Sequence, residues 1–170
     1  YVDASALEVG TVLAVSGVTV TSGNVNISAS SLNLNANVLA GGVAGSAALV
    51  GVGGITQTSG VITGQTVTLD SAAAVGTLAD PIDINAVGLA GTAGGEFSVA
   101  NASTLQVFDV TLGGAGPGVR IDAGGCGMSL AGTISAPLAP VQLNSSGAID
   151  TTHPGVDILA TALTLVAAGG

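Results

Sequence analysis

Apolar and polar residues alternate along much of this chain, most clearly between residues 55 and 84. There, Val67 and Leu69 are separated by Thr68 and preceded by Thr66. Alternation with a period of two puts Val67 and Leu69 on one face of a β-strand and the two threonines on the other. Turn-forming Gly, Asp and Pro residues flank this strand. The stretch therefore predicts short strands joined by corners, with Val67 and Leu69 pointing inward.

The same spacing recurs along the chain. An apolar residue is followed five positions later by an apolar pair two apart at three places: Ile27, Leu32 and Leu34; Ile62, Val67 and Leu69; Ile158, Leu163 and Leu165. Other apolar pairs repeat after 23 residues, from Val107 to Leu130, or after 22, from Leu143 to Leu165. A period of about 20–24 residues predicts an all-β solenoid, in which each coil buries its apolar face on its neighbours.

The end of the chain aligns with the stretch that begins at Ile55. If two extra residues are allowed near His153, residues 148–170 match that stretch with Ile149 on Ile55 and Ile158 on Ile62. We therefore expect these pairs to occupy equivalent positions in different coils. About eight coils of roughly 21 residues would form one segment over residues 1–170, with a length on the order of 40 Å, and we expect this segment to be a fragment of a longer repetitive protein.

The period is interrupted between Leu34 and Leu69, which are 35 residues apart. This interval contains the Gly/Ala-rich range 36–55, which is long enough to span a bilayer as a helix. Its six glycines, its lack of basic or aromatic flanking residues and the strand-like spacing on both sides argue against a membrane span. We expect 36–55 to form an irregular turn or insertion.

Composition limits the interior and the partners. Hydrophobic residues make up 48% of the chain but aromatic residues only 2%, and 28 residues are glycine. Small aliphatic side chains suit a narrow, stacked interior, and the absence of Lys and scarcity of Glu predict little or no α-helix. The formal net charge of −9, with one Arg, leaves no basic surface for nucleic acid or anionic lipid.

Glycine and proline mark the predicted corners. The run GGAGPG at 113–118 is followed by no Lys and by no helix start, so we interpret it as a corner rather than a phosphate-binding loop. Further corners are expected at 124–127 and between Pro137 and Pro140, where the missing N–H of proline does least harm.

Few residues are candidates for chemistry. Cys126 has no partner in the chain and is interpreted as a small buried residue, with an intermolecular disulfide as the alternative. His153 is expected in a surface loop, because no second His and no nearby Cys would complete a metal site. Arg120 is expected to pair with Asp122 or Asp109.

Other polar residues leave alternatives open. Two aspartate pairs, Asp80 with Asp83 and Asp150 with Asp157, are more typical of turns than of a Ca²⁺ site, because no known Ca²⁺ loop pattern is present. The asparagines at 24, 26, 33 and 35 form either stacked amide ladders or a solvent-facing edge. The sequons at Asn26, Asn101 and Asn144 matter only if the source glycosylates its proteins. We assign no residue to catalysis, a cofactor or a metal.

One stretch resembles a known family. The run Ile55-Thr-Gln, Gly60, Ile62, Val67-x-Leu69, Val75-Gly76 and Asp80-Pro81 resembles the repeats of filamentous haemagglutinin-type exoproteins, which Gram-negative bacteria export by two-partner secretion. The resemblance covers residues 54–107 and 146–170. It implies a right-handed parallel β-helix, secreted to the bacterial cell surface, that serves as an adhesin stalk or filament. The family's N-terminal secretion domain is not seen in these residues.

Three classes of function follow from these patterns. The first is a structural filament, fibre or stalk that self-associates end to end or laterally. The second is a module that binds a host or surface glycan, or ice through the Thr-x-Thr pairs at 19–21, 56–58 and 66–68. The third, a polysaccharide-degrading enzyme, is disfavoured because the acids do not cluster with Arg120 and no Trp or Lys can bind a sugar chain. We therefore expect a non-enzymatic structural protein.

Overall fold

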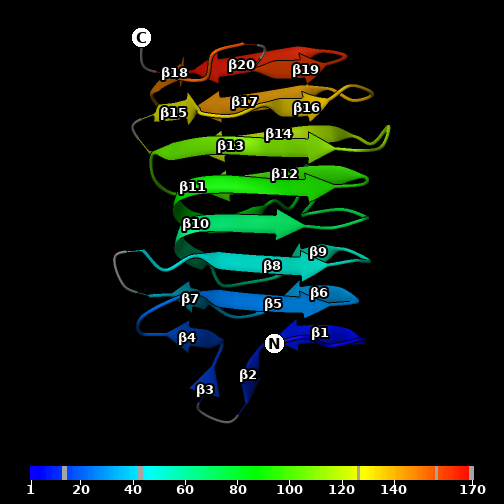
Figure 1. Ribbon diagram of the computed structural model, residues 1–170, viewed down its shortest axis with the longest axis vertical. Coiled ribbons are helices and arrows are strands. Elements are labelled where there is room, and N and C mark those ends of the chain that lie inside the picture. The colour runs from blue at the N-terminus through cyan, green and yellow to red at the C-terminus, as the bar shows by residue number, and fades with distance from the viewer. Residues whose placement is uncertain (13–14, 42–43, 126, 156, 169–170) are drawn as a thin grey trace.

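The computed structural model describes residues 1–12, 15–41, 44–125, 127–155 and 157–168, and these residues form 20 β-strands and no helix. The strands stack along the long axis, with the N-terminus at one end and the C-terminus at the other (Figure 1). All strand pairs among the described residues are parallel except one hairpin, formed by β2 (Thr11–Val12) and β3 (Val15–Ser16). The expected all-β solenoid is confirmed.

The remaining strands form three stacks, each of which continues by parallel pairing from coil to coil. The first stack contains β1 (Ala6–Val9), β6 (Ser31–Leu34), β9 (Ile55–Gln57), β12 (Glu96–Asn101), β14 (Gly118–Ala123), β17 (Val141–Ser145) and β20 (Leu163–Ala167). The second contains β4 (Val18–Val20), β7 (Val38–Ala40) and the first halves of β10 (Ile62–Asp70) and β11 (Ile82–Ala93). It joins the first stack at its last strand, because Ile82 and Ile84 of β11 also pair with Val99 and Asn101 of β12.

The third stack begins with β5 (Val25–Ala29) and β8 (Ala47–Gly51), and continues through the second halves of β10 and β11. It ends with β13 (Leu105–Leu112), β15 (Gly127–Leu130), β16 (Ile134–Ala136), β18 (Ala148–Thr151) and β19 (Ile158–Ala160).

Apolar side chains at matching positions form columns inside the solenoid. One column runs through eight register partners: Leu7, Leu32, Ile55, Val75, Phe97, Val119, Val141 and Leu163. Their seven intervals are 25, 23, 20, 22, 22, 22 and 22 residues, so the solenoid has about seven turns rather than eight. Parallel ladders place equivalent residues about 4.8 Å apart. Each coil therefore covers the apolar surface of the next.

The inward assignment of the starting strand is confirmed. Val67 and Leu69 are fully buried in β10, whereas Thr66 and Thr68 are partly exposed on its outer face. Leu69 lies between Leu49 of β8 and Gly91 of β11 in its column. The intervals from Val107 to Leu130 and from Leu143 to Leu165 are also confirmed, because each joins direct register partners.

The alignment of the chain's end with Ile55 is wrong. Ile149 pairs with Met128 and Ile158 with Ile134, both in the third stack, whereas Ile55 belongs to the first stack. The physical reason is that every stack needs the same inward apolar pair two residues apart. The spacing therefore identifies an inward strand without saying which of the three stacks it joins.

The expectation of an irregular turn or insertion at 36–55 is also wrong for the strands in that range, which alternate with turns and connecting residues. Strands β7 and β8 lie in it, and each is paired on both sides, β7 with β4 and β10, and β8 with β5 and β10. Ala40, Ala47 and Leu49 point inward and are buried. The interval between Leu34 and Leu69 is long because these residues belong to different stacks. No helix in the described part of the chain is long and apolar enough to cross a membrane.

Glycine is required where coils approach closely. In the expected corner at 113–118, a Cβ on Gly116 would lie 1.6 Å from the carbonyl oxygen of Gly95 in the coil below. A Cβ on Gly91 would lie 2.8 Å from the Phe97 ring and 2.2 Å from the Leu69 carbonyl oxygen. Gly91 thus makes room for Phe97, the largest fully buried side chain among the described residues.

Candidate functional site

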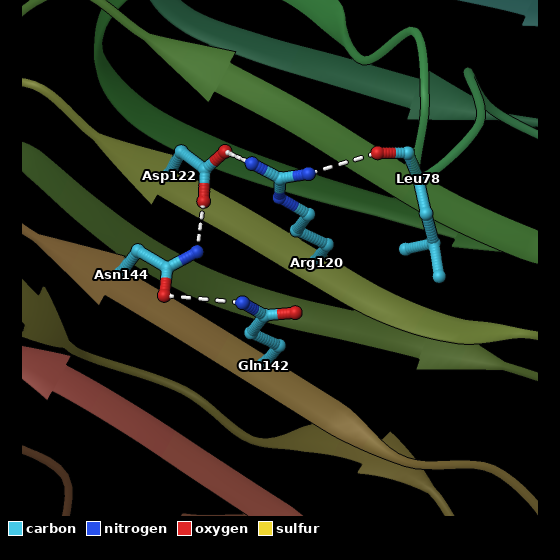
Figure 2. A network of polar contacts seen from close by, with 5 residues as sticks. All are labelled: Leu78, Arg120, Asp122, Gln142 and Asn144. Carbon is cyan, nitrogen blue, oxygen red and sulfur yellow. Dashed lines mark hydrogen bonds and ion pairs between the residues drawn. The ribbon is translucent and has the colours of Figure 1, made fainter.

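A connected group of polar side chains lies on the outer face of β14 and β17. The parallel register pairs Arg120 with Gln142 and Asp122 with Asn144, so the four side chains form a block, which we call the outer polar cluster (Figure 2). Arg120 Nη2 lies 2.7 Å from Asp122 Oδ2, the Asn144 amide donates to Asp122 Oδ1, and Gln142 Nε2 lies 3.3 Å from Asn144 Oδ1. Three side-chain contacts thus join these four residues on the outer face of two strands of the first stack.

The pairing expected for Arg120 is resolved by this geometry. Arg120 pairs with Asp122. The alternative prediction, a pair with Asp109, is wrong, because Asp109 lies in the third stack, where its Oδ1 accepts the backbone N–H of Thr133 at 2.9 Å. The Arg120 and Asp122 side chains are 32% and 22% exposed, so water weakens their attraction.

Arg120 also holds a loop. Its Nη1 donates to the carbonyl oxygen of Leu78 at 2.8 Å (Figure 2). The N–H of Leu78 donates in turn to the Glu96 carboxylate. Residues 77–81 form a tight turn closed by two backbone hydrogen bonds between Thr77 and Asp80, of 2.9 and 3.1 Å. Arg120 of the outer polar cluster therefore ties the loop at 77–81 to β14. An ion pair and two amides can hold neighbouring groups in place. The four side chains of the cluster include no nucleophile beside a base.

Removal of the arginine should release this loop. We expect Arg120→Met to lower the free energy of unfolding by about 1 kcal/mol, because one partly exposed ion pair and one hydrogen bond are lost. Amide hydrogen exchange within residues 77–81 should become faster while exchange in β17 stays unchanged. Gln142→Met, at the adjacent register position, is the matched control. Equal exchange in 77–81 for both variants would show that Arg120 does not hold the loop.

The other chemical candidates lie apart from this cluster. His153 is in the loop between β18 and β19, with Nδ1 3.4 Å from Asp157 Oδ1, an ion pair only when the imidazole is protonated. Asp80 belongs to the turn at 77–81, and Asp150 lies on β18 opposite Ser129. Within the described ranges, no group of three or more His, Cys, Asp or Glu side chains is placed to hold a metal ion. Cys126 lies outside the described residues.

Two buried amides have a structural role that the sequence did not reveal. Asn101 Oδ1 accepts the Ala86 N–H at 2.9 Å, and Asn101 Nδ2 donates to the Ala86 carbonyl at 3.2 Å. Gln57 makes the same two contacts with the backbone of Asp83, accepting its N–H and donating to its carbonyl at 3.4 Å. Both side chains replace a missing backbone partner where a strand of one coil has no neighbour in register. No local sequence pattern separates them from solvent-facing amides.

Stacked amide ladders, one of the two arrangements that the sequence left open for the asparagines at 24, 26, 33 and 35, are not what these residues form. Asn33 accepts from Thr56 at 3.3 Å, and Asn35 joins Glu8 to Thr58, so the described contacts link unlike polar side chains. Asn26 is exposed. Of the three sequon asparagines, Asn101 is buried and bonded to backbone, which leaves no room for a glycan.

The Thr-x-Thr pairs do not form one surface. Thr19 lies on β4 in the second stack, Thr56 on β9 in the first, and Thr66 with Thr68 on the third-stack half of β10. A flat ice-binding array requires the rows to lie on one face, so this arrangement does not supply it.

The N-terminal residues contain the perturbed titratable groups. Hydrogen bonds from the Ser5 hydroxyl, 2.6 Å, and the Ser5 backbone N–H, 2.9 Å, lower the pKa of Asp3. The hydrogen bond from the Tyr1 hydroxyl to Asp3 raises the pKa of Tyr1. Because the pKa of Asp3 is lowered on folding, its contribution to stability is present above the unfolded value and is lost as the pH falls through the folded one. Both groups are fully exposed, so the effect is local.

Comparison with protein-family models, with curated proteins and with solved structures finds no match to this chain. The resemblance to filamentous haemagglutinin-type repeats therefore stays a prediction from the sequence.

Proposed function

We propose that this chain is a structural rod, a segment of an extracellular filament, fibre or adhesin stalk on a bacterial surface. The observation that carries the proposal is the continuous apolar column from Leu7 to Leu163, which joins all the described coils into one element. Seven intervals of about 4.8 Å give a rod about 34 Å long. Such a rod becomes longer with each added coil, because every new coil packs on the previous one through the same contacts.

The outside of the molecule supports a spacer role. Its outward positions are mostly Ser, Thr, Asn, Ala and Gly, and a net charge of −9 opposes nonspecific clustering. The outer polar cluster fits this role as well, because it fastens a loop to the rod. Export to the cell surface is supported by the resemblance of the repeats, and a glycan on a host or surface is the partner that a stalk of this kind would present or contact.

Duplication of a coil tests the structural role. Residues 119–140 span one register interval, since Val119 pairs directly with Val141. A chain with three extra copies of 119–140 should fold, with an unchanged or higher melting temperature, and small-angle scattering should show a rod about 14 Å longer. Loss of cooperative folding on duplication would contradict the modular rod.

Localisation and binding assays separate the stalk from its alternatives. We expect antibodies to this segment to label the outside of intact source cells and the segment alone to give no signal on a glycan array. Labelling only after permeabilisation would overturn the surface role. Specific glycan binding by the isolated segment would favour an adhesive module instead.

A further inference from the structure

Ser98 is a fully buried serine on the outer face of the rod. It lies on β12 between Phe97 and Val99, whose buried side chains belong to the core, so alternation directs Ser98 outward. Ser98 is nevertheless 0% exposed, whereas Arg120 and Gln142, which follow it in the same outward row, are partly exposed. Another segment of the chain therefore covers this position.

The loop at 77–81 is the covering segment. The N–H of Leu78 donates to the Glu96 carboxylate, and the Leu78 carbonyl accepts from Arg120 Nη1 at 2.8 Å. Glu96 lies two residues before Ser98 on the same face of β12, and Arg120 is the register partner of Ser98 in the next coil. The two contacts of Leu78 therefore lie on either side of Ser98.

Two polar atoms beside this loop have no partner. Ser98 Oγ and Arg120 Nε are both buried, and neither makes a hydrogen bond within the part of the chain that the structure describes. The two terminal nitrogens of the guanidinium contact Leu78 and Asp122 (Figure 2), whereas Nε contacts neither. Folded proteins satisfy nearly all buried polar atoms, and they use ordered water where no protein atom is in reach. Two such atoms at adjacent register positions point to one shared partner.

We propose that one ordered water molecule is bound beneath the loop at 77–81, where it bridges Ser98 Oγ and Arg120 Nε. Water suits both atoms, because its oxygen accepts the Nε–H and its own O–H donates to the serine oxygen. A halide ion could accept from both atoms, but the guanidinium charge is already paired with Asp122, and the Glu96 carboxylate flanks the site. Charge therefore favours neutral water. The bridge joins β12 to β14 beneath the loop.

A crystal structure at a resolution that shows ordered water tests the site directly. We expect a density peak within hydrogen-bonding distance of both Ser98 Oγ and Arg120 Nε, and no anomalous signal there after a bromide soak. An anomalous peak at this position would identify an anion site instead. A direct hydrogen bond between the two side chains, or density that reaches only one of them, would also overturn the bridge.

Ser98→Ala tests the water in solution through the sign of its effect. If the water bridges the two side chains, the substitution removes a satisfied hydroxyl and leaves Nε with a poorer partner. The midpoint of urea unfolding should then fall, and amide hydrogen exchange within 77–81 should become faster. If the Ser98 hydroxyl has no partner, its removal relieves a buried polar group, and the midpoint should stay unchanged or rise. Ser129→Ala, at a partly exposed outward position on β15, is the matched control and should leave the midpoint unchanged.

A double-mutant cycle with Arg120→Met distinguishes a bridge from an independent effect of the serine. The Nε–H is absent in the Arg120→Met background, so Ser98→Ala should lower the urea midpoint there by much less than in the unmodified chain. Equal lowering in both backgrounds would contradict the bridge. That outcome would leave the proposed rod intact, because neither side chain belongs to the inner columns.

Discussion

Leu69→Asp should unfold this protein or leave it with little stability. Leu69 is fully buried, its backbone pairs with β8 on one side and β11 on the other, and its side chain faces only the inner column. The substitution removes a buried aliphatic group, which costs about 3–5 kcal/mol, and adds a carboxylate that no cation can reach. Since domains of this size are stable by about 5–15 kcal/mol, we expect a much lower denaturation midpoint in urea, followed by circular dichroism.

Thr68→Asp is the matched control, because it introduces the same charge one residue away. Thr68 lies on the outer face of β10 between Ala48 and Ala90, so its carboxylate would remain in water. We expect a change in the free energy of unfolding within about 1 kcal/mol. Similar destabilisation by both substitutions would show that the two faces of β10 are not inside and outside.

The strands themselves were predictable from the sequence because inward and outward residues alternate. Val67 and Leu69 were placed correctly by this rule alone, and the interval of 22 residues from Leu143 to Leu165 is a true coil-to-coil distance. The order of the strands in space was harder to predict. All three stacks select the same small aliphatic residues, so Ile149 and Ile158 matched strands of the wrong stack in the alignment with Ile55 and Ile62.

Composition was also a poor guide to the structure of the Gly/Ala-rich range 36–55. Glycine and alanine are poor strand formers, and their abundance suggested an irregular segment. In a narrow interior the available space decides instead, and Ala40 and Ala47 fill it on β7 and β8. Tertiary packing thus outweighs the intrinsic preference of the residue.

Only some contacts of the outer polar cluster could be predicted from the sequence. The pairing of Arg120 with Asp122 follows from alternation, since residues two apart on a strand share a face. Contact with Leu78 joins residues 42 positions apart and depends on how the loop at 77–81 folds back over the rod. No short-range pattern encodes such a contact.

Asn101→Ala should destabilise the protein by about 3 kcal/mol. The Asn101 amide holds both backbone groups of Ala86, at 2.9 and 3.2 Å, and also donates to the Ser103 carbonyl at 2.8 Å, while the side chain is buried. Without it, the N–H and carbonyl of Ala86 lose their partner away from water, and each unsatisfied group costs about 1–3 kcal/mol. Urea unfolding should show a lower midpoint with an unchanged slope, and hydrogen exchange at the Ala86 amide should become faster.

Asn26→Ala removes the same amide from an exposed position and should change the free energy of unfolding by less than about 0.5 kcal/mol. Asn101→Asp sharpens the test because a carboxylate still accepts the Ala86 N–H but repels the carbonyls of Ala86 and Ser103. Burial beside those carbonyls raises the pKa of the new carboxyl in the folded state, so the variant should gain stability as the pH falls towards that pKa, since its protonated form donates again. If Asn101→Ala and Asn26→Ala unfold at the same urea concentration, the Asn101 amide does not act as a backbone partner, and the ladder between β11 and β12 is held by the main chain alone.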